Sequence, residues 1–236
     1  MKTTGFIIKI IILFISLSCF SCINNIKQNE SIENFSYPIL IDTGELKTQD
    51  SILVYTFQNT TAHHNIFYLG KLKDSVKIST FPFIVGTAHS SEDYIYHSYF
   101  NSAVIPKYKY YTSTKFKIYI DTTQLLNTIG NYNSVNKSYP AFIYNSSNDT
   151  IIIGFGEFVN PIVQIKNNEN KWIDLEHPHI YDCGTGLAEI ILPPNEYLIS
   201  STPIYKGNYK TKMRLKFGDN ISNEINCAIP ENIINN

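Results

Sequence analysis

The sequence predicts an all-β protein, and three observations support this prediction. Tyr, Ile, Thr and Asn dominate the chain, and these residues favour strands and turns over helices. Apolar residues recur in short continuous runs or at every second position, as in buried and half-buried strands. Clusters of Asn, Asp, Ser and Gly separate these runs, as turns do in a β-sandwich. Hydrophobic residues make up 43% of the chain, so a sizeable core is available.

Residues 1–21 are typical of an export signal. Lys2 and Lys9 supply positive charge, and an apolar run at 10–20 follows. This run is too short to cross a bilayer, which needs about 20 apolar residues in a helix. We therefore exclude residues 1–21 from the fold.

A small residue directly before a cysteine closes this segment. Ser21 precedes Cys22, and polar residues follow from Asn24. This arrangement resembles the lipobox of bacterial lipoproteins, although neither candidate cysteine has Leu three positions before it. The resemblance implies that Cys22 becomes a lipidated N-terminus carrying palmitate or similar chains. Cys19, which follows Ser18, is the alternative site, and a plain secretory signal is the alternative interpretation.

The rest of the chain divides by composition into a polar stretch and a β-rich body. Residues 22–36 are rich in Asn, Gln, Glu, Ser and Lys, so we expect a flexible tether. Residues 131–138 are polar and aperiodic, so we expect a linker or a long inter-strand loop there. The sequence therefore predicts a β-rich N-terminal domain at 37–130 and a second β domain at 139–236.

In the first domain, the apolar runs predict strands at 51–57, 66–69, 75–78 and 115–120. Residues 121–129 fit one short helical turn with Asp121 or Thr122 as its N-cap. His63 and His64 are adjacent, so on a strand they would point to opposite sides and would not bind one metal ion together. We expect them to lie in a surface turn. Six tyrosines are candidates for a recognition surface, with strand packing as the alternative: Tyr94, Tyr96, Tyr99, Tyr108, Tyr110 and Tyr111.

In the second domain, the runs predict strands at 141–144, 150–156, 162–166, 171–175, 189–192, 196–200, 210–217 and 224–229. The turn at 167–170 predicts a hairpin with Trp172 just after it. Gly154 and Gly156 lie inside a strand pattern with no helix after them. They therefore indicate a bulge or a close backbone approach and not a dinucleotide loop.

Three motifs follow one another in this domain: an Asn-Ser-Ser-Asn-Asp-Thr turn at 145–150, Leu-Pro-Pro at 192–194, and Tyr-Lys-Thr-Lys-Met-Arg at 209–214. With the hairpin before Trp172, their order resembles the immunoglobulin-like modules of bacterial cell-envelope lipoproteins, above all uncharacterised ones from Bacteroidota. The resemblance implies an immunoglobulin-like β-sandwich with a binding or structural role and no catalytic residues.

The densest cluster of potential ligands is Glu176-His177-Pro178-His179, with Asp182 and Cys183 close behind. Imidazole, carboxylate and thiolate groups together bind zinc, but this spacing matches no standard zinc pattern. We expect a polar inter-strand loop and no cofactor, with His177, His179 and Asp182 as the metal candidates. A thiol at Cys183 beside Gly184 and Gly186 matches no cysteine-hydrolase signature.

Apart from the two lipidation candidates, the cysteines of the chain are Cys183 and Cys227. An oxidising envelope compartment permits a disulfide between them, and spacing alone cannot prove it. A buried thiol at Cys183 is the alternative.

The formal net charge is -1, with no evident basic face, so nucleic-acid binding has no electrostatic support. No Gly-x-Ser-x-Gly elbow is present. We therefore expect a lipid-anchored envelope protein, on the periplasmic or surface face, with a non-enzymatic binding or structural role and a protein or glycan partner. Two alternatives stay open: an envelope hydrolase or metal-binding enzyme that uses the loop from His177 to Cys183, and an inhibitor or immunity-like protein.

Overall fold

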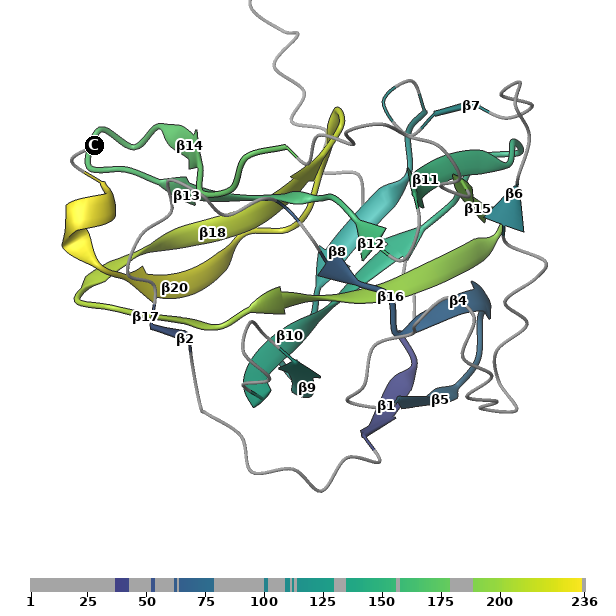
Figure 1. Cartoon of the computed structure of the whole chain (residues 1–236), viewed down its shortest axis with the longest axis horizontal. Coiled ribbons are helices and arrows are strands. Elements are labelled where there is room, and N and C mark those ends of the chain that lie inside the picture. The colour runs from purple at the N-terminus through teal and green to yellow at the C-terminus, as the bar shows by residue number, and fades with distance from the viewer. Residues whose placement is uncertain are drawn as a thin grey trace, which may run out of the picture. The chain divides into compact units, whose positions relative to one another are not determined.

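The computed structural model describes residues 37–42, 52–53, 62, 64–78, 100–101, 109–110, 112, 114–129, 135–155, 158–178 and 189–234. Regular structure in these residues is almost entirely β-strand, which confirms the predicted fold class (Figure 1). A 3-10 helix at Glu231–Ile233 follows the last strand. The signal and the tether lie outside the described residues, so they stay predictions.

A central antiparallel sheet is built around the two long strands β10 (Val135–Tyr144) and β16 (Glu196–Pro203). Figure 1 shows them running side by side through the middle of the body, and Phe142 is paired with Ile199. The other strands of this sheet are β4 (Tyr68–Lys71), β8 (Lys117–Ile120) and β9 (Leu126–Ile129). The order is β4-β16-β10-β8, with β9 also paired to β10.

Both faces of this sheet are buried, because apolar residues occupy consecutive positions along its strands. Ala141, Ile143 and Leu198 belong to one core cluster, which is mainly aliphatic. Phe142 and Tyr197 belong to a second cluster, which is rich in aromatic rings. Since successive side chains of a strand point to opposite faces, the central sheet separates two cores.

On the aliphatic side, two further sheets complete the main sandwich. One has the order β3-β12-β11-β15-β6 with β7 paired to β11, and the other has the order β14-β13-β18-β19 with β20 paired to β18. The strands of the first sheet are β3 (His64–Asn65), β12 (Phe158–Val159), β11 (Ile151–Phe155), β15 (Glu189–Leu192), β6 (Phe100–Asn101) and β7 (Lys109–Tyr110). The strands of the second are β14 (Trp172–Asp174), β13 (Ile162–Lys166), β18 (Tyr209–Phe217), β19 (Asn220–Ile221) and β20 (Ile225–Ile229).

On the aromatic side, β1 (Ile39–Asp42) and β5 (Ser75–Ile78) form a parallel pair. Val76 and Ile78 pack into the aromatic cluster. The ring of Tyr37 stacks on Tyr119, with 4.4 Å between centroids. Parallel pairing also joins β7 to β11 and β2 (Ile52–Leu53) to β17 (Tyr205–Lys206), whose Tyr205 packs into the aliphatic cluster.

The structure does not place a boundary at 131–138. Residues 135–138 begin β10, and strands from both sides of the expected linker share the central sheet. Residues 37–236 form one compact unit. A polar side chain at the start of β10 is buried and hydrogen-bonded within the sheet. Ser138 is 1% exposed, and its Oγ lies 2.7 Å from Oγ1 of Thr128. The immunoglobulin-like pattern of 139–236 stays a prediction.

Two local predictions had different outcomes. The prediction of a helical turn in 121–129 was wrong. Oδ1 of Asp121 accepts a hydrogen bond from the Thr123 amide at 2.8 Å, in a bend that leads into β9. The irregularity expected at Gly154 is confirmed. The register with β15 shifts there, and a Cβ would lie 2.4 Å from the Phe158 carbonyl oxygen.

Candidate functional site

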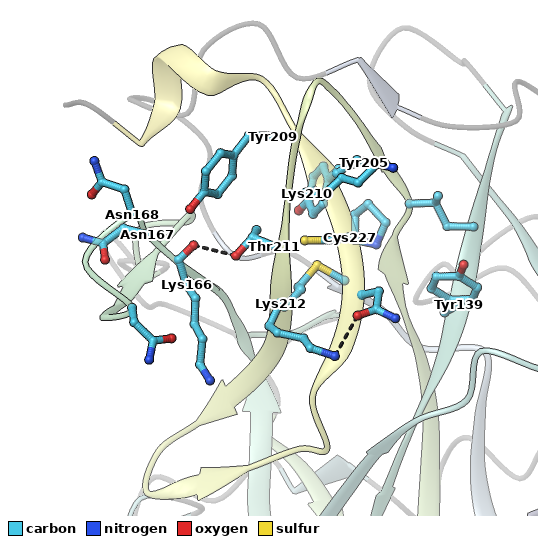
Figure 2. A pocket seen from close by; sticks show the side chains of 16 residues that line it. Tyr139, Lys166, Asn167, Asn168, Tyr205, Tyr209, Lys210, Thr211, Lys212 and Cys227 are labelled. Atoms are coloured by element: carbon cyan, nitrogen blue, oxygen red, sulfur yellow. Dashed lines mark hydrogen bonds between the residues drawn. The ribbon is translucent and has the colours of Figure 1, made fainter.

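A pocket of about 820 Å³ lies beside β18, and we call it the β18 pocket. Its walls come from the β13–β14 turn, from β18 and β20, from the segment between β16 and β17, and from β10. Figure 2 shows Asn167 and Asn168 on one side of the pocket and Tyr139 on the other. Amide and phenol groups dominate the polar lining: Asn167, Asn168, Asn170, Asn226, Tyr139, Tyr205 and Tyr209.

Local hydrogen bonds hold the turn that forms one wall. Oδ1 of Asn167 accepts the amides of Glu169 at 3.1 Å and Lys171 at 2.9 Å. Asn170 has φ 59°, a conformation that Asn tolerates better than most residues. Oγ1 of Thr211 donates to the carbonyl oxygen of Lys166 at 2.7 Å, which ties β18 to the start of the turn (Figure 2). Asn168 has no part in these bonds and is exposed in the pocket.

The outer face of β18 carries a row of four cations, Lys210, Lys212, Arg214 and Lys216, which we call the basic ladder. The burial pattern of the strand alternates, with Met213, Leu215 and Phe217 buried on the other face. Alternate residues of a strand lie about 6.8 Å apart, so the ladder extends over about 20 Å. Lys210 and Lys212 also line the β18 pocket, so the ladder and the pocket are continuous.

Residues of neighbouring strands contact two members of the ladder, Arg214 and Lys212. The guanidinium of Arg214 lies over the ring of Trp172, with 3.9 Å from Cζ to the centroid, and Nζ of Lys166 lies 4.9 Å from the same centroid. Nε of Arg214 donates to Oε1 of Gln164 at 2.8 Å. Nζ of Lys212 donates to Oδ1 of Asn226 at 2.7 Å (Figure 2). These contacts order Arg214 and Lys212 of the ladder, together with the adjacent Lys166.

This face is positively charged although the whole chain is close to neutral. Its basic residues are Lys166 and the four residues of the ladder, and its acidic residues are Asp174 and Glu224. Five positive against two negative side chains give +3, compared with -1 for the whole chain. The expectation of no basic face was therefore wrong, because total composition hides the alternation of charge at 210–216.

A largely buried ion pair joins β3 to the segment that follows β14. Nε2 of His64 is 3.2 Å from Oε2 of Glu176, and the His64 side chain is 4% exposed. Nδ1 of His64 lies 2.8 Å from the carbonyl oxygen of Ser201. Both partners are acceptors, so the doubly protonated ring satisfies both. Burial lowers the pKa of His64, but the charge of Glu176 and the hydrogen bonds outweigh it, so the net shift is upward.

Two polar groups that line the β18 pocket, Tyr205 and Cys227, are held in their neutral forms. Burial, together with Glu176 and Cys227, raises the pKa of Tyr205 well above its usual value. Burial raises the pKa of the Cys227 thiol to about 11. A thiolate is the nucleophilic form, so Cys227 is not activated for chemistry near neutral pH.

The predicted site residues have mixed outcomes. His64 is a buried member of β3 and does not lie in the surface turn that we expected. His177 is exposed, and its carbonyl oxygen accepts the amide of Ala62 at 2.9 Å. Cys227 forms no disulfide with a described residue, and Cys183 lies outside the described residues, so their pairing stays a prediction.

Several other candidates also lie outside the described residues: Cys19, Cys22, His63, His179, Asp182, Tyr94, Tyr96, Tyr99, Tyr108 and Tyr111. Of the tyrosine group, Tyr110 is placed on β7, and its hydroxyl donates to Oε1 of Glu189 at 3.3 Å. Within the described ranges, His, Cys, Asp and Glu side chains form no group of three or more that could hold a metal ion. None of the helical structure in this part of the chain is long and apolar enough to cross a membrane.

Sequence reasoning missed the β18 pocket and the basic ladder. The ladder had a readable signal, because basic residues occupy every second position from 210 to 216 in a predicted strand. The pocket had none, since its walls come from parts of the chain between Tyr139 and Ala228. Comparison with protein-family models, with curated proteins and with solved structures gives no match to this chain.

Proposed function

We propose that this chain is a lipid-anchored cell-envelope protein whose β-rich body binds a glycan in the β18 pocket without catalysing a reaction. The observation that carries the proposal is the lining of the pocket, in which Asn side chains stand beside Tyr rings. An amide both donates and accepts hydrogen bonds, as adjacent sugar hydroxyls require. A Tyr ring supplies an apolar surface with a polar end.

The neutral state of Cys227 and Tyr205 supports a binding role. Both groups line the pocket, and burial stabilises the protonated form of each. Neither is poised to act as a nucleophile or base near neutral pH. The export signal and the Ser21-Cys22 pair support the envelope location and the anchor.

Glycan binding is tested by filling the pocket. Asn168→Trp places a large ring at an exposed position of the pocket wall and spares the bonds that shape the turn. We expect the full-length chain in detergent to retain glycans on an array of envelope polysaccharides, and Asn168→Trp to lose at least tenfold in affinity, about 1.4 kcal/mol.

The matched control is Asn148→Trp, which changes an exposed Asn in the turn between β10 and β11. It should bind as the parent does. Equal binding by both variants, or no retained glycan for the parent, would contradict a glycan site in this pocket.

The anchor is tested by metabolic labelling with an alkyne fatty acid. Cys22→Ser should abolish the label, because the lipidated thiol is removed. Label that persists in Cys22→Ser and disappears in Cys19→Ser would move the site to Cys19, and label that survives in both variants would contradict lipidation at either.

A further inference from the structure

We infer that the glycan bound by this protein is an acidic polysaccharide, whose carboxylates lie along the basic ladder while its hydroxyls enter the β18 pocket. This inference rests on the proposed glycan-binding function and names its ligand class. We call the positively charged face formed by Lys166 and the basic ladder the cationic face. It shares residues with the pocket, because Lys166, Lys210 and Lys212 belong to this face and also line the pocket.

The charge of the face indicates the sign of the ligand. The cationic face has a net charge of +3 on a chain whose total is -1, so positive charge is concentrated there. Local fields of this kind attract anions and raise their association rates. A single small anion would use one or two of these cations, whereas a linear polyanion can contact the row along its full extent.

Three of the five cations of this face are also held in place before a ligand arrives. Arg214 is held between Trp172 and Gln164, and Lys212 is held by Asn226. Nζ of Lys166 is 3.4 Å from Oε2 of Glu224. Side chains that are already ordered lose less conformational entropy on binding, which favours affinity. Ordered cations at intervals of about 6.8 Å suit a chain with regularly repeated charges.

The adjoining groups favour a polysaccharide over other polyanions. A carboxylated sugar chain carries both anions for the ladder and hydroxyls for the amides of Asn167 and Asn168. A lipid bilayer offers a plane of headgroups and would be met by inserted apolar side chains. In the described part of this sheet, Ile221 is the one large apolar side chain that is exposed, at 48%. A single such side chain is too little for insertion into a bilayer. A nucleic acid would need stacking platforms, but Trp172 is covered by Arg214 and Lys166.

The experiment compares polygalacturonate oligosaccharides with their fully methyl-esterified forms, which have the same backbone and no charge. Binding to the immobilised full-length chain is measured at about 50 mM and about 200 mM salt, since screening weakens interactions between exposed charges. The ladder variant is Lys210→Gln with Lys212→Gln. The control variant, Lys71→Gln with Lys77→Gln, removes equal charge from exposed residues of β4 and β5.

We expect the acid form to bind at least tenfold more tightly than the ester, and high salt to reduce this preference. The ladder variant should lose about tenfold in affinity for the acid and little for the ester, because each exposed charge contact contributes modestly. The control variant should match the parent.

Other outcomes overturn the inference in distinguishable ways. Equal binding of acid and ester, unaffected by the ladder variant, would leave the glycan-binding function standing and reject the acidic ligand. Absence of binding by both forms, together with no retained glycan on the array, would reject the function itself. Tighter binding to a single-stranded oligonucleotide of equal charge, or to vesicles of phosphatidylglycerol, would assign the ladder to another class of polyanion. Circular dichroism melting of each variant shows that the fold is retained.

Discussion

The two faces of β18 differ in what their side chains contact. The inner face carries Met213, Leu215 and Phe217, which are at most 1% exposed and belong to the aliphatic core. The outer face carries the basic ladder, in which Arg214 contacts Trp172 and Gln164 and Lys212 contacts Asn226 on neighbouring strands. A single alternating strand therefore separates the residues that stabilise the fold from those proposed to bind a ligand.

Two ion pairs near this sheet differ in exposure in the same way. His64 and Glu176 form a buried pair. In the β13–β14 turn, Lys171 and Glu169 form an exposed pair, with 2.7 Å between Nζ and Oε2. Loss of one partner should therefore cost more in the buried pair, because the remaining group has lost most of its water. In the exposed pair, the remaining group can return to solvent.

Removing apolar volume from the inner face should have the largest effect. Leu215→Ala should lower the free energy of unfolding by about 3 kcal/mol, because it leaves a cavity at a fully buried position. Urea unfolding at constant temperature measures this loss. The neighbouring Lys216→Ala, on the outer face, should cost under about 0.5 kcal/mol. Similar losses in both variants would mean that the two faces are not divided in this way.

Breaking the buried ion pair should have the next largest effect, and this effect depends on pH. The pKa of His64 is raised in the folded state. Its contribution to stability is therefore complete below about pH 6.5, the usual pKa of the unfolded residue, and is lost as pH rises through the higher folded value. Glu176→Gln should cost about 2 kcal/mol near pH 5.5 and less near pH 9.

The control for this change is Glu169→Gln, which removes one member of the exposed pair. Urea unfolding across the pH range should show almost no difference between this variant and the parent. A cost of Glu176→Gln that grows with rising pH would refute a charged His64 in the folded protein.

Arg214 lies on the outer face of β18 but is partly buried. We therefore expect its removal to affect stability more than the removal of an exposed lysine. Arg214→Ala should cost about 1 kcal/mol through loss of the contact with Trp172 and the bond to Gln164. Trp172 is the single tryptophan of the chain, so its fluorescence emission should shift as the covering cation is removed. Arg214→Lys should retain part of both properties, and an unchanged emission in Arg214→Ala would contradict the stacked arrangement.

The smallest effect on stability is expected at Lys212, which is exposed. Lys212→Gln should change the free energy of unfolding by under about 0.5 kcal/mol, yet weaken binding of polygalacturonate by about threefold. Thermal unfolding and ligand titration together separate the two quantities. Lys77→Gln, on β5, should affect neither. A large loss of stability in Lys212→Gln would show that the ladder supports the fold.

Much of the strand content was readable from local patterns. The alternation at 75–78 and 162–166 predicted β5 and β13, and the turn at 167–170 predicted the hairpin that leads to Trp172. Such patterns are short-range, since they depend on which face a side chain occupies. The helical turn at 121–129 failed because Asp121 bonds the amide two residues ahead and the chain then joins β10 as β9.

The candidate site was less predictable, because it depends on contacts between distant residues. His64 and Glu176 are 112 positions apart, and adjacent histidines gave no sign that one would be buried beside a carboxylate. The polar residues at 135–138 also gave no local sign of burial. They are accommodated because Thr128 on β9 bonds Ser138 and the carbonyl oxygen of Asn136.

The sequence by itself determined the β class, the positions of most described strands and the two-residue period that places four cations on one face of β18. Only the tertiary structure decided that the segments on both sides of 131–138 share a sheet, that the pocket forms, and that His64 meets Glu176. The physical reason is range: side-chain alternation is a property of a few neighbouring residues, whereas sheet order and buried pairs depend on how the whole chain closes its cores.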